Sequence, residues 1–168
     1  MGYTAKAVAN YFYDLAQKDK QPITPLQIQK LVYIAHGWHL GLMGQPLVDD
    51  EYAEAWEHGP VFPSLYHEFK HFRGNPIRHP AEELRDGGNP LDDSSYINPN
   101  VEEEEEELRN FLNQIWDVYK KYSGRKLSAM SHGTGTPWST TRQREGKIRN
   151  APIRNEDIKA FYKARLEK

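Results

Sequence analysis

Residues 24–38 read TPLQIQKLVYIAHGW, and this stretch decides the fold class. Thr24 carries the hydroxyl of a helix N-cap, Pro25 fits the first helical position, and Gln27 stands where a capping box requires glutamine. Apolar residues then recur at helical spacing, at Ile28, Leu31, Val32, Ala35 and Trp38. The pattern predicts a helix that ends at the glycine- and proline-containing break over residues 41–46.

Outside this helix, apolar residues at every third or fourth position predict five more helices. Their expected starts or centres are Thr4, Pro63, Asn100, Leu127 and Asn155, with Thr4, Asn100 and Asn155 as caps. Residues 47–61 are too short and too mixed to decide between a small β-element and a helical turn. The fold is therefore predicted to be mainly α, with about five to seven helices and an undecided element around residues 47–61.

The length and composition predict one domain over residues 1–168. A chain of 168 residues buries about 70% of its unfolded surface, which suffices for a core. Residues 73–100 are rich in glycine, proline and polar residues and predict a long surface insertion. The chain has no cysteine, no apolar run as long as the ~18 residues of a membrane span, and no signal-peptide pattern. We expect a soluble cytoplasmic protein.

The net charge of −2 hides an asymmetry along the chain. Residues 117–168 carry 13 Lys or Arg against 5 Asp or Glu, so this end is basic. The basic positions Arg142, Arg144, Lys147 and Arg149 could meet nucleic acid or an acidic partner. The alternative is that the basic and acidic regions compensate each other within one fold.

Residues 67–71 read HEFKH, the H-E-x-x-H spacing by which zinc proteases hold their metal. His67 and His71 share one helical face, but that face points away from the apolar stripe of the same helix. The third ligand of the extended motif would fall on Ile77, which has no donor atom. We expect two solvent-facing histidines and no metal, and keep a zinc metalloprotease as an alternative.

No other stretch gives positive support for an enzyme. His36 and His39 lie three residues apart on the second helix, but the sequence ties no carboxylate to them, which favours packing or hydrogen bonding over metal ligation. The chain lacks a cysteine nucleophile, and none of its serines stands in a nucleophile-elbow motif. No cofactor is predicted.

Three blocks, LQIQKLVYIAHGWHLGLMGQPL at 26–47, EAWEHGPVFPSLYHEFKHF at 54–72 and LSAMSHGTGTPW at 127–138, form a recognisable set. In order and spacing they resemble the Panacea domain family of prokaryotic and phage proteins, which includes SocA-like antitoxins. The motif positions, which we interpret as scaffold, are Leu31, His36, Trp38, Ala55, Trp56, Gly59, Pro60, Phe69, His132, Pro137 and Trp138.

The resemblance implies an antitoxin that is not an enzyme, which binds a toxin encoded beside it and neutralises it. In SocA-like members the antitoxin can instead deliver the toxin to a cellular protease. The implied partners are therefore the cognate toxin and a protease, with no membrane. Nucleic-acid binding through the basic C-terminal region remains, beside the metalloprotease, an alternative function.

The residues divide into scaffold and surface. Gly59 and Pro60 suit a tight turn, and large rings such as Trp38, Trp56 and Trp138 are more often core than interface. Lys30 and Tyr33 lie off the apolar stripe of the second helix, so we expect them to be exposed. The expected partner-binding residues are Lys30, Tyr33, Tyr66, His67, His71, Arg142 and Arg144, with Lys147 and Arg149 beside them.

Overall fold

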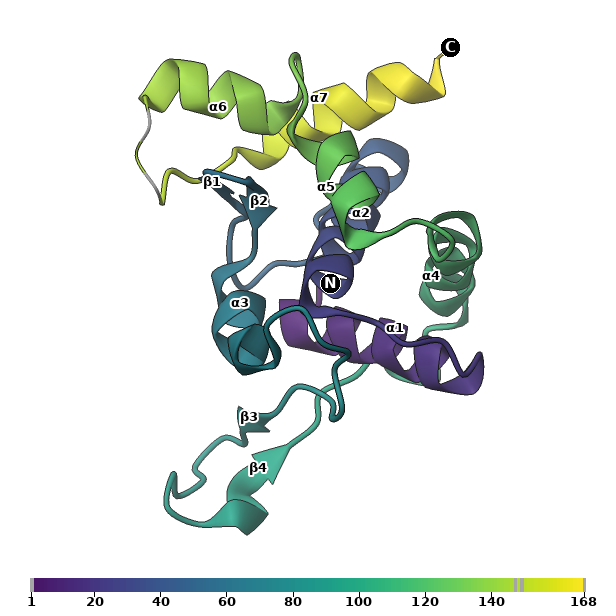
Figure 1. The fold of residues 1–168 in the computed structure, drawn as a ribbon. Coiled ribbons are helices and arrows are strands. Elements are labelled where there is room, and N and C mark those ends of the chain that lie inside the picture. Colours follow the sequence, from purple (N-terminus) through teal and green to yellow (C-terminus); the bar gives the residue numbers. More distant parts are fainter. Residues whose placement is uncertain (1, 147, 149, 168) are drawn as a thin grey trace.

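The protein was analysed as a computed structural model that describes residues 2–146, 148 and 150–167 (Figure 1). Within these residues it is mainly helical, as predicted, with seven α-helices and two small antiparallel sheets. The helices are α1 (Ala5–Lys18), α2 (Pro25–Met43), α3 (Pro63–Phe69), α4 (Glu106–Tyr119), α5 (Gly124–His132), α6 (Pro137–Glu145) and α7 (Asn155–Leu166). The sheets pair β1 (Glu54–Trp56) with β2 (Gly59–Val61), and β3 (Glu83–Leu84) with β4 (Tyr96–Ile97). Short 3-10 turns occupy η1 (Lys70–Phe72) and η2 (Asp93–Ser95).

Local capping signals fix the start and the end of α2. The Thr24 hydroxyl accepts a hydrogen bond from the backbone N–H of Gln27 at 3.2 Å, and the Thr24 N–H donates to Gln27 Oε1 at 2.9 Å. This is the predicted capping box, with Pro25 in the first turn. Gly44 ends the helix in the left-handed conformation at φ 76°, where its N–H donates to the Leu40 carbonyl.

α2 is the central helix of the fold. α1, α5 and α7 pack against it, and Figure 1 shows α1 below α2 and α7 above it. A Cβ added at Gly37 would overlap the ring of Tyr162, and one added at Gly41 would lie 3.1 Å from the backbone nitrogen of Lys163. These two glycines, four residues apart, therefore let α7 approach the backbone of α2 closely.

The predicted exposure of Lys30 and Tyr33 is wrong. All residues from 28 to 37 are buried, and the side chains of Lys30 and Tyr33 are each 1% exposed. The physical reason is that α2 is not an amphipathic surface helix with one apolar stripe, because its middle is packed against five other helices and β2. Tyr33 lies in the core against Phe62, with ring centroids 6.5 Å apart, so it is not part of the surface.

Two helix boundaries and one whole helix differ from the prediction. α4 begins at Glu106 rather than at Asn100, because the Asn100 side chain donates to Asp14 and accepts from the Val101 N–H. α7 does contain Asn155, but as its first residue, and its side chain binds His36 instead of capping the helix. α6 was not predicted, since its sequence is polar and buries only Pro137 and Thr141.

The segment 73–100 leaves the body of the protein and returns. Its anchors are buried: Ile77 is in the core and donates its N–H to the Ile23 carbonyl, and Asn10 holds Ala81 by two hydrogen bonds. Asn10 also donates to the Pro99 carbonyl on the returning segment. Between Ala81 and Pro99 the β3–β4 hairpin projects away from the helices (Figure 1), and Leu91 at its tip is 93% exposed. Among the described helices, none combines the length and the apolar character that crossing a membrane demands.

Candidate functional site

The element left undecided at residues 47–61 is an antiparallel hairpin, β1–β2. Ala55 pairs with Pro60 and Trp56 with Gly59, and the turn between them holds Glu57 and His58. Gly59 adopts φ 122°, a conformation that L side chains rarely adopt. A Cβ at this position would also lie 2.9 Å from the Nζ atom of Lys30, so a side chain here would strain the backbone and displace the Lys30 ammonium group.

Two buried polar residues of α2 hold the hairpin from below. The Gln29 side chain accepts from the Phe62 N–H at 2.8 Å and donates to the Phe62 carbonyl at 3.2 Å. The ammonium group of Lys30 donates to the Pro60 carbonyl at 2.6 Å. Because Lys30 is almost fully buried, loss of hydration lowers its pKa from 10.5 to about 7.

Side chains from α5 and α6 hold the hairpin from the other side. The Ser128 hydroxyl donates to the His58 carbonyl at 3.1 Å, Trp138 Nε1 donates to the Trp56 carbonyl at 2.6 Å, and Arg142 donates to the Ala55 carbonyl at 3.0 Å. The His132 ring meets Trp138 edge to face at 5.3 Å. The motif residues of three distant sequence blocks thus meet at one hairpin, which accounts for their joint occurrence.

His36 performs a similar task deeper in the fold. Its Nδ1 accepts the Val48 N–H at 3.1 Å, and its Nε2 lies 3.1 Å from Asn155 Oδ1, so the neutral ring carries its proton on Nε2. Burial lowers the pKa of His36 from 6.5 to about 4. The expected hydrogen-bonding role is therefore confirmed, since one ring ties α2 to the start of α7 and to the segment before β1.

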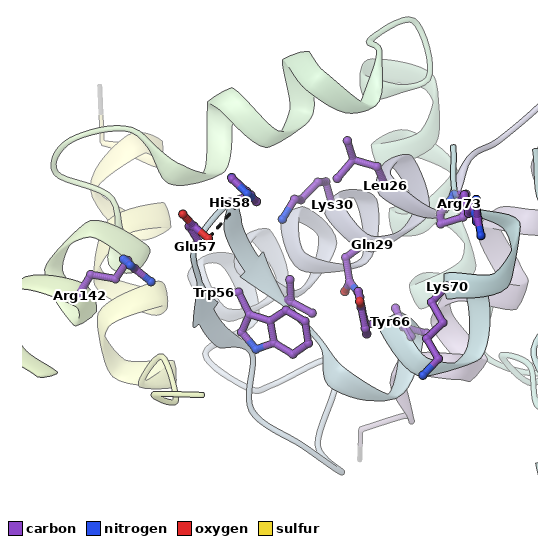
Figure 2. A pocket seen from close by; sticks show the side chains of 13 residues that line it. Leu26, Gln29, Lys30, Trp56, Glu57, His58, Tyr66, Lys70, Arg73 and Arg142 are labelled. Atoms are coloured by element: carbon purple, nitrogen blue, oxygen red, sulfur yellow. Dashed lines mark ion pairs between the residues drawn. The ribbon is translucent and has the colours of Figure 1, made fainter. Parts of the chain in front are cut away.

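A groove of about 770 Å³ opens between this hairpin, α2 and α3 (Figure 2). Trp56 and Tyr66 form its aromatic part, with ring centroids 4.8 Å apart in an edge-on arrangement. Trp56, predicted to be a core residue, is half-buried and presents its ring to the groove. Among the described residues, the lining consists of Pro25, Leu26, Gln29, Lys30, Trp56, Glu57, His58, Val61, Leu65, Tyr66, Lys70, Arg73 and Arg142.

Three of the predicted partner-binding residues, Lys30, Tyr66 and Arg142, line this groove. Arg144 does not, because it pairs with Asp157 at 3.0 Å on α7. Lys147 and Arg149 lie outside the described residues, so the proposed basic patch is represented only by two arginines that make contacts within the fold.

The two histidines of the H-E-x-x-H motif are exposed and do not line the groove. His67 packs against the Tyr66 ring at 5.4 Å, and His71 stacks on His79 at 5.5 Å. The motif is split, since α3 ends at Phe69 and His71 belongs to the following 3-10 turn. Within residues 2–146, 148 and 150–167, no three His, Cys, Asp or Glu side chains are grouped so that they could hold a metal ion.

Sequence reasoning missed several groove residues, among them Gln29, Leu26, Lys70 and Arg73. Gln29 and Lys30 gave a usable signal, because two adjacent long polar residues on an otherwise apolar helix need buried hydrogen-bond partners. Lys70 and Arg73 gave none, since their place in the groove depends on how α3 packs.

Two comparisons with known proteins find relatives of this chain. The family model described as "Antitoxin SocA-like, Panacea domain" matches residues 28–139. The chain is also 31% identical over 139 residues to the protein named Antitoxin SocA of Caulobacter vibrioides, a match that covers 80% of this chain and 68% of that protein. No solved structure gives a significant match.

Proposed function

Because this chain belongs to the SocA-like Panacea domain family of antitoxins, we propose that it neutralises a cognate toxin by binding it directly, and that the groove beside the β1–β2 hairpin is the contact surface. The toxin is a protein encoded beside the antitoxin gene. The proposal treats the chain as a binding protein and not as an enzyme.

The observation that carries the proposal is the construction of the groove. Lys30, Ser128 and Trp138 hydrogen-bond the hairpin from α2, α5 and α6, so its backbone is held on both sides. Its surface offers a half-buried tryptophan and an exposed tyrosine, residue types that often anchor protein interfaces. A rigid frame with aromatic anchors loses little conformational entropy on binding.

The test is co-expression of the chain with the product of the adjacent gene. Growth should stop when that gene is expressed alone and recover when the chain is present, and the two proteins should co-purify. Tyr66→Ala should weaken co-purification and rescue, while Tyr52→Ala serves as the matched control, since Tyr52 is 58% exposed and does not line the groove.

The same cells distinguish binding from delivery to a protease. If the chain neutralises by binding, the amount of toxin measured by immunoblot stays constant or rises as growth recovers. A fall in toxin that depends on a cellular protease would contradict direct neutralisation. If no adjacent product is toxic or none binds the chain, the proposed function is refuted.

A further inference from the structure

The groove carries an excess of positive charge. Among the described residues, its lining contains four basic residues, Lys30, Lys70, Arg73 and Arg142, and one acidic residue, Glu57. The Oε2 atom of Glu57 lies 3.9 Å from Nε2 of His58. Figure 2 shows Arg142 toward one end of the groove and Lys70 and Arg73 toward the other, with the aromatic pair between them. A ligand that spans the groove therefore meets cations at both ends and an apolar centre.

Lys30 contributes a polar group, its ammonium, to this apolar centre. Its side chain is 1% exposed, yet it forms part of the groove wall. An ammonium group has three N–H donors, and the Pro60 carbonyl occupies one of them. In the part of the chain that the structure describes, Lys30 forms no ion pair. A buried cation with spare donors is stabilised strongly by an incoming carboxylate.

We propose that the groove receives an acidic segment of the toxin, with a carboxylate on Lys30, an apolar side chain against Trp56 and Tyr66, and further carboxylates at the Arg142 and Lys70–Arg73 ends. This inference rests on the proposed function and adds the chemistry of the partner. The basic residues of the groove then determine which toxin is bound, because complementary charge selects the partner and speeds encounter.

A single-stranded nucleic acid is the other ligand that cations and aromatic rings can bind. The groove favours a polypeptide because its remaining wall is aliphatic, formed by Pro25, Leu26, Val61 and Leu65. Leucine, valine or phenylalanine side chains of a toxin would remove this wall from water, whereas a nucleic-acid strand brings sugars and phosphates to it.

Binding should then be linked to protonation of Lys30. Burial lowers the pKa of Lys30 to about 7, and a carboxylate beside it raises that pKa again. Complex formation takes up a proton above pH 7, so affinity falls between pH 7 and pH 9. The other charged or titratable groups around Lys30 are Glu57 and His58 on the hairpin, His132 on α5, Arg142 on α6, and Tyr66, Lys70 and Arg73 on the α3 side.

The first experiment measures the affinity of the full chain for the toxin identified by growth rescue. Replacing both Lys70 and Arg73 by Glu should weaken binding about tenfold or more, because rim charges of the wrong sign repel the partner. The matched control replaces Lys18 and Lys163 by Glu, which changes the net charge equally on exposed residues away from the groove, and should change affinity less than about twofold. Equal effects of the two pairs would overturn the proposal.

The second experiment maps the contact. A carbodiimide joins a lysine amine to a neighbouring carboxylate as an amide, and mass spectrometry identifies both residues. We expect links from Lys70 to Asp or Glu residues of one toxin segment, and their loss in Lys70→Arg without loss of affinity. Links from Lys18 or Lys163 with none from Lys70 would overturn the proposal.

The third experiment tests whether Lys30 is the group that takes up the proton when the complex forms. Lys30→Met should abolish the decrease in affinity between pH 7 and pH 9, and an unchanged decrease would refute the role of Lys30. If Lys30→Met does not fold, as judged by circular dichroism, the two experiments on Lys70 and Arg73 decide alone.

Binding of a ten-nucleotide single-stranded RNA that Lys70→Glu and Arg73→Glu abolish would favour nucleic acid and overturn the proposal. Absence of any toxin binding by the unaltered chain would instead refute the proposed function.

Discussion

Acidification should destabilise the fold through His36. This ring is neutral in the folded state, where it accepts the Val48 N–H and donates to Asn155, and its pKa is lowered from 6.5 to about 4 by burial. The unfolded chain binds the proton below pH 6.5, whereas the folded chain resists it until about pH 4. Stability from this group is therefore complete above pH 6.5 and is lost as the pH falls through that window.

The magnitude follows from the difference between the two pKa values. Each pH unit inside the window costs up to about 1.4 kcal/mol of unfolding free energy, and the total loss is about 3 kcal/mol once the pH reaches 4. Protonation would also place a second N–H where Nδ1 now accepts the Val48 N–H, so the link between α2 and the segment before β1 would break.

Urea denaturation at pH 7, 6, 5 and 4.5 measures the effect, with His36→Asn as the control. Asparagine can still accept the Val48 N–H near the position of Nδ1 but has no charge to gain. The variant loses the ring that packs edge-on against Phe62 at 5.6 Å, so it should be less stable at pH 7 by about 1–3 kcal/mol. The difference in unfolding free energy between the two proteins should shrink as the pH falls. If the unfolding free energies of both proteins decrease equally with pH, the role given to His36 is refuted.

Three further predictions concern α2 and the projecting hairpin. Unfolding free energy should rise from pH 7 to pH 9 because Lys30 has a folded pKa of about 7 and an unfolded pKa of 10.5, and Lys30→Met should flatten that rise in urea denaturation. Gly37→Ala should cost about 1–3 kcal/mol, since the added methyl group overlaps Tyr162, whereas Gly133→Ala, which meets its nearest atom at 3.8 Å, should leave thermal melting almost unchanged. Replacing residues 86–94 by a short Gly-Ser linker should change stability by less than about 1 kcal/mol and leave growth rescue intact, because this tip is largely exposed. A loss of rescue with normal melting would show that the tip contacts the toxin.

The parts of the fold that the sequence predicts are those governed by local interactions. The capping box that starts α2 and the prolines in the first turns of α2 and α3 act within four residues, so the printed sequence contains the whole signal. Asn100 shows the limit of this reasoning. It stands three residues before a glutamate, as a capping box requires, yet a carboxylate 86 positions away, on Asp14, takes its side chain.

The groove could be predicted only in part because it is a product of tertiary packing. The three sequence blocks identify the residues that frame the β1–β2 hairpin, but not that Gln29 and Lys30 hold it from inside the protein. The predicted exposure of Lys30 is wrong for the same reason, since one-sided amphipathicity assumes a surface helix, whereas all residues of α2 from 28 to 37 are buried. The sequence does not predict α6 because this helix buries little apolar surface and so lacks an apolar stripe.

Hydrogen–deuterium exchange of the chain, alone and with its toxin, tests most directly whether the antitoxin acts through this groove. Backbone amides of residues 54–73, which cover the β1–β2 hairpin, α3 and η1, should exchange more slowly in the complex, together with the first turn of α2. Residues 82–98 and the exposed face of α7 should exchange at the same rate in both samples. Protection confined to residues 82–98 or to α7, with residues 54–73 unchanged in a complex that still neutralises the toxin, would contradict the account.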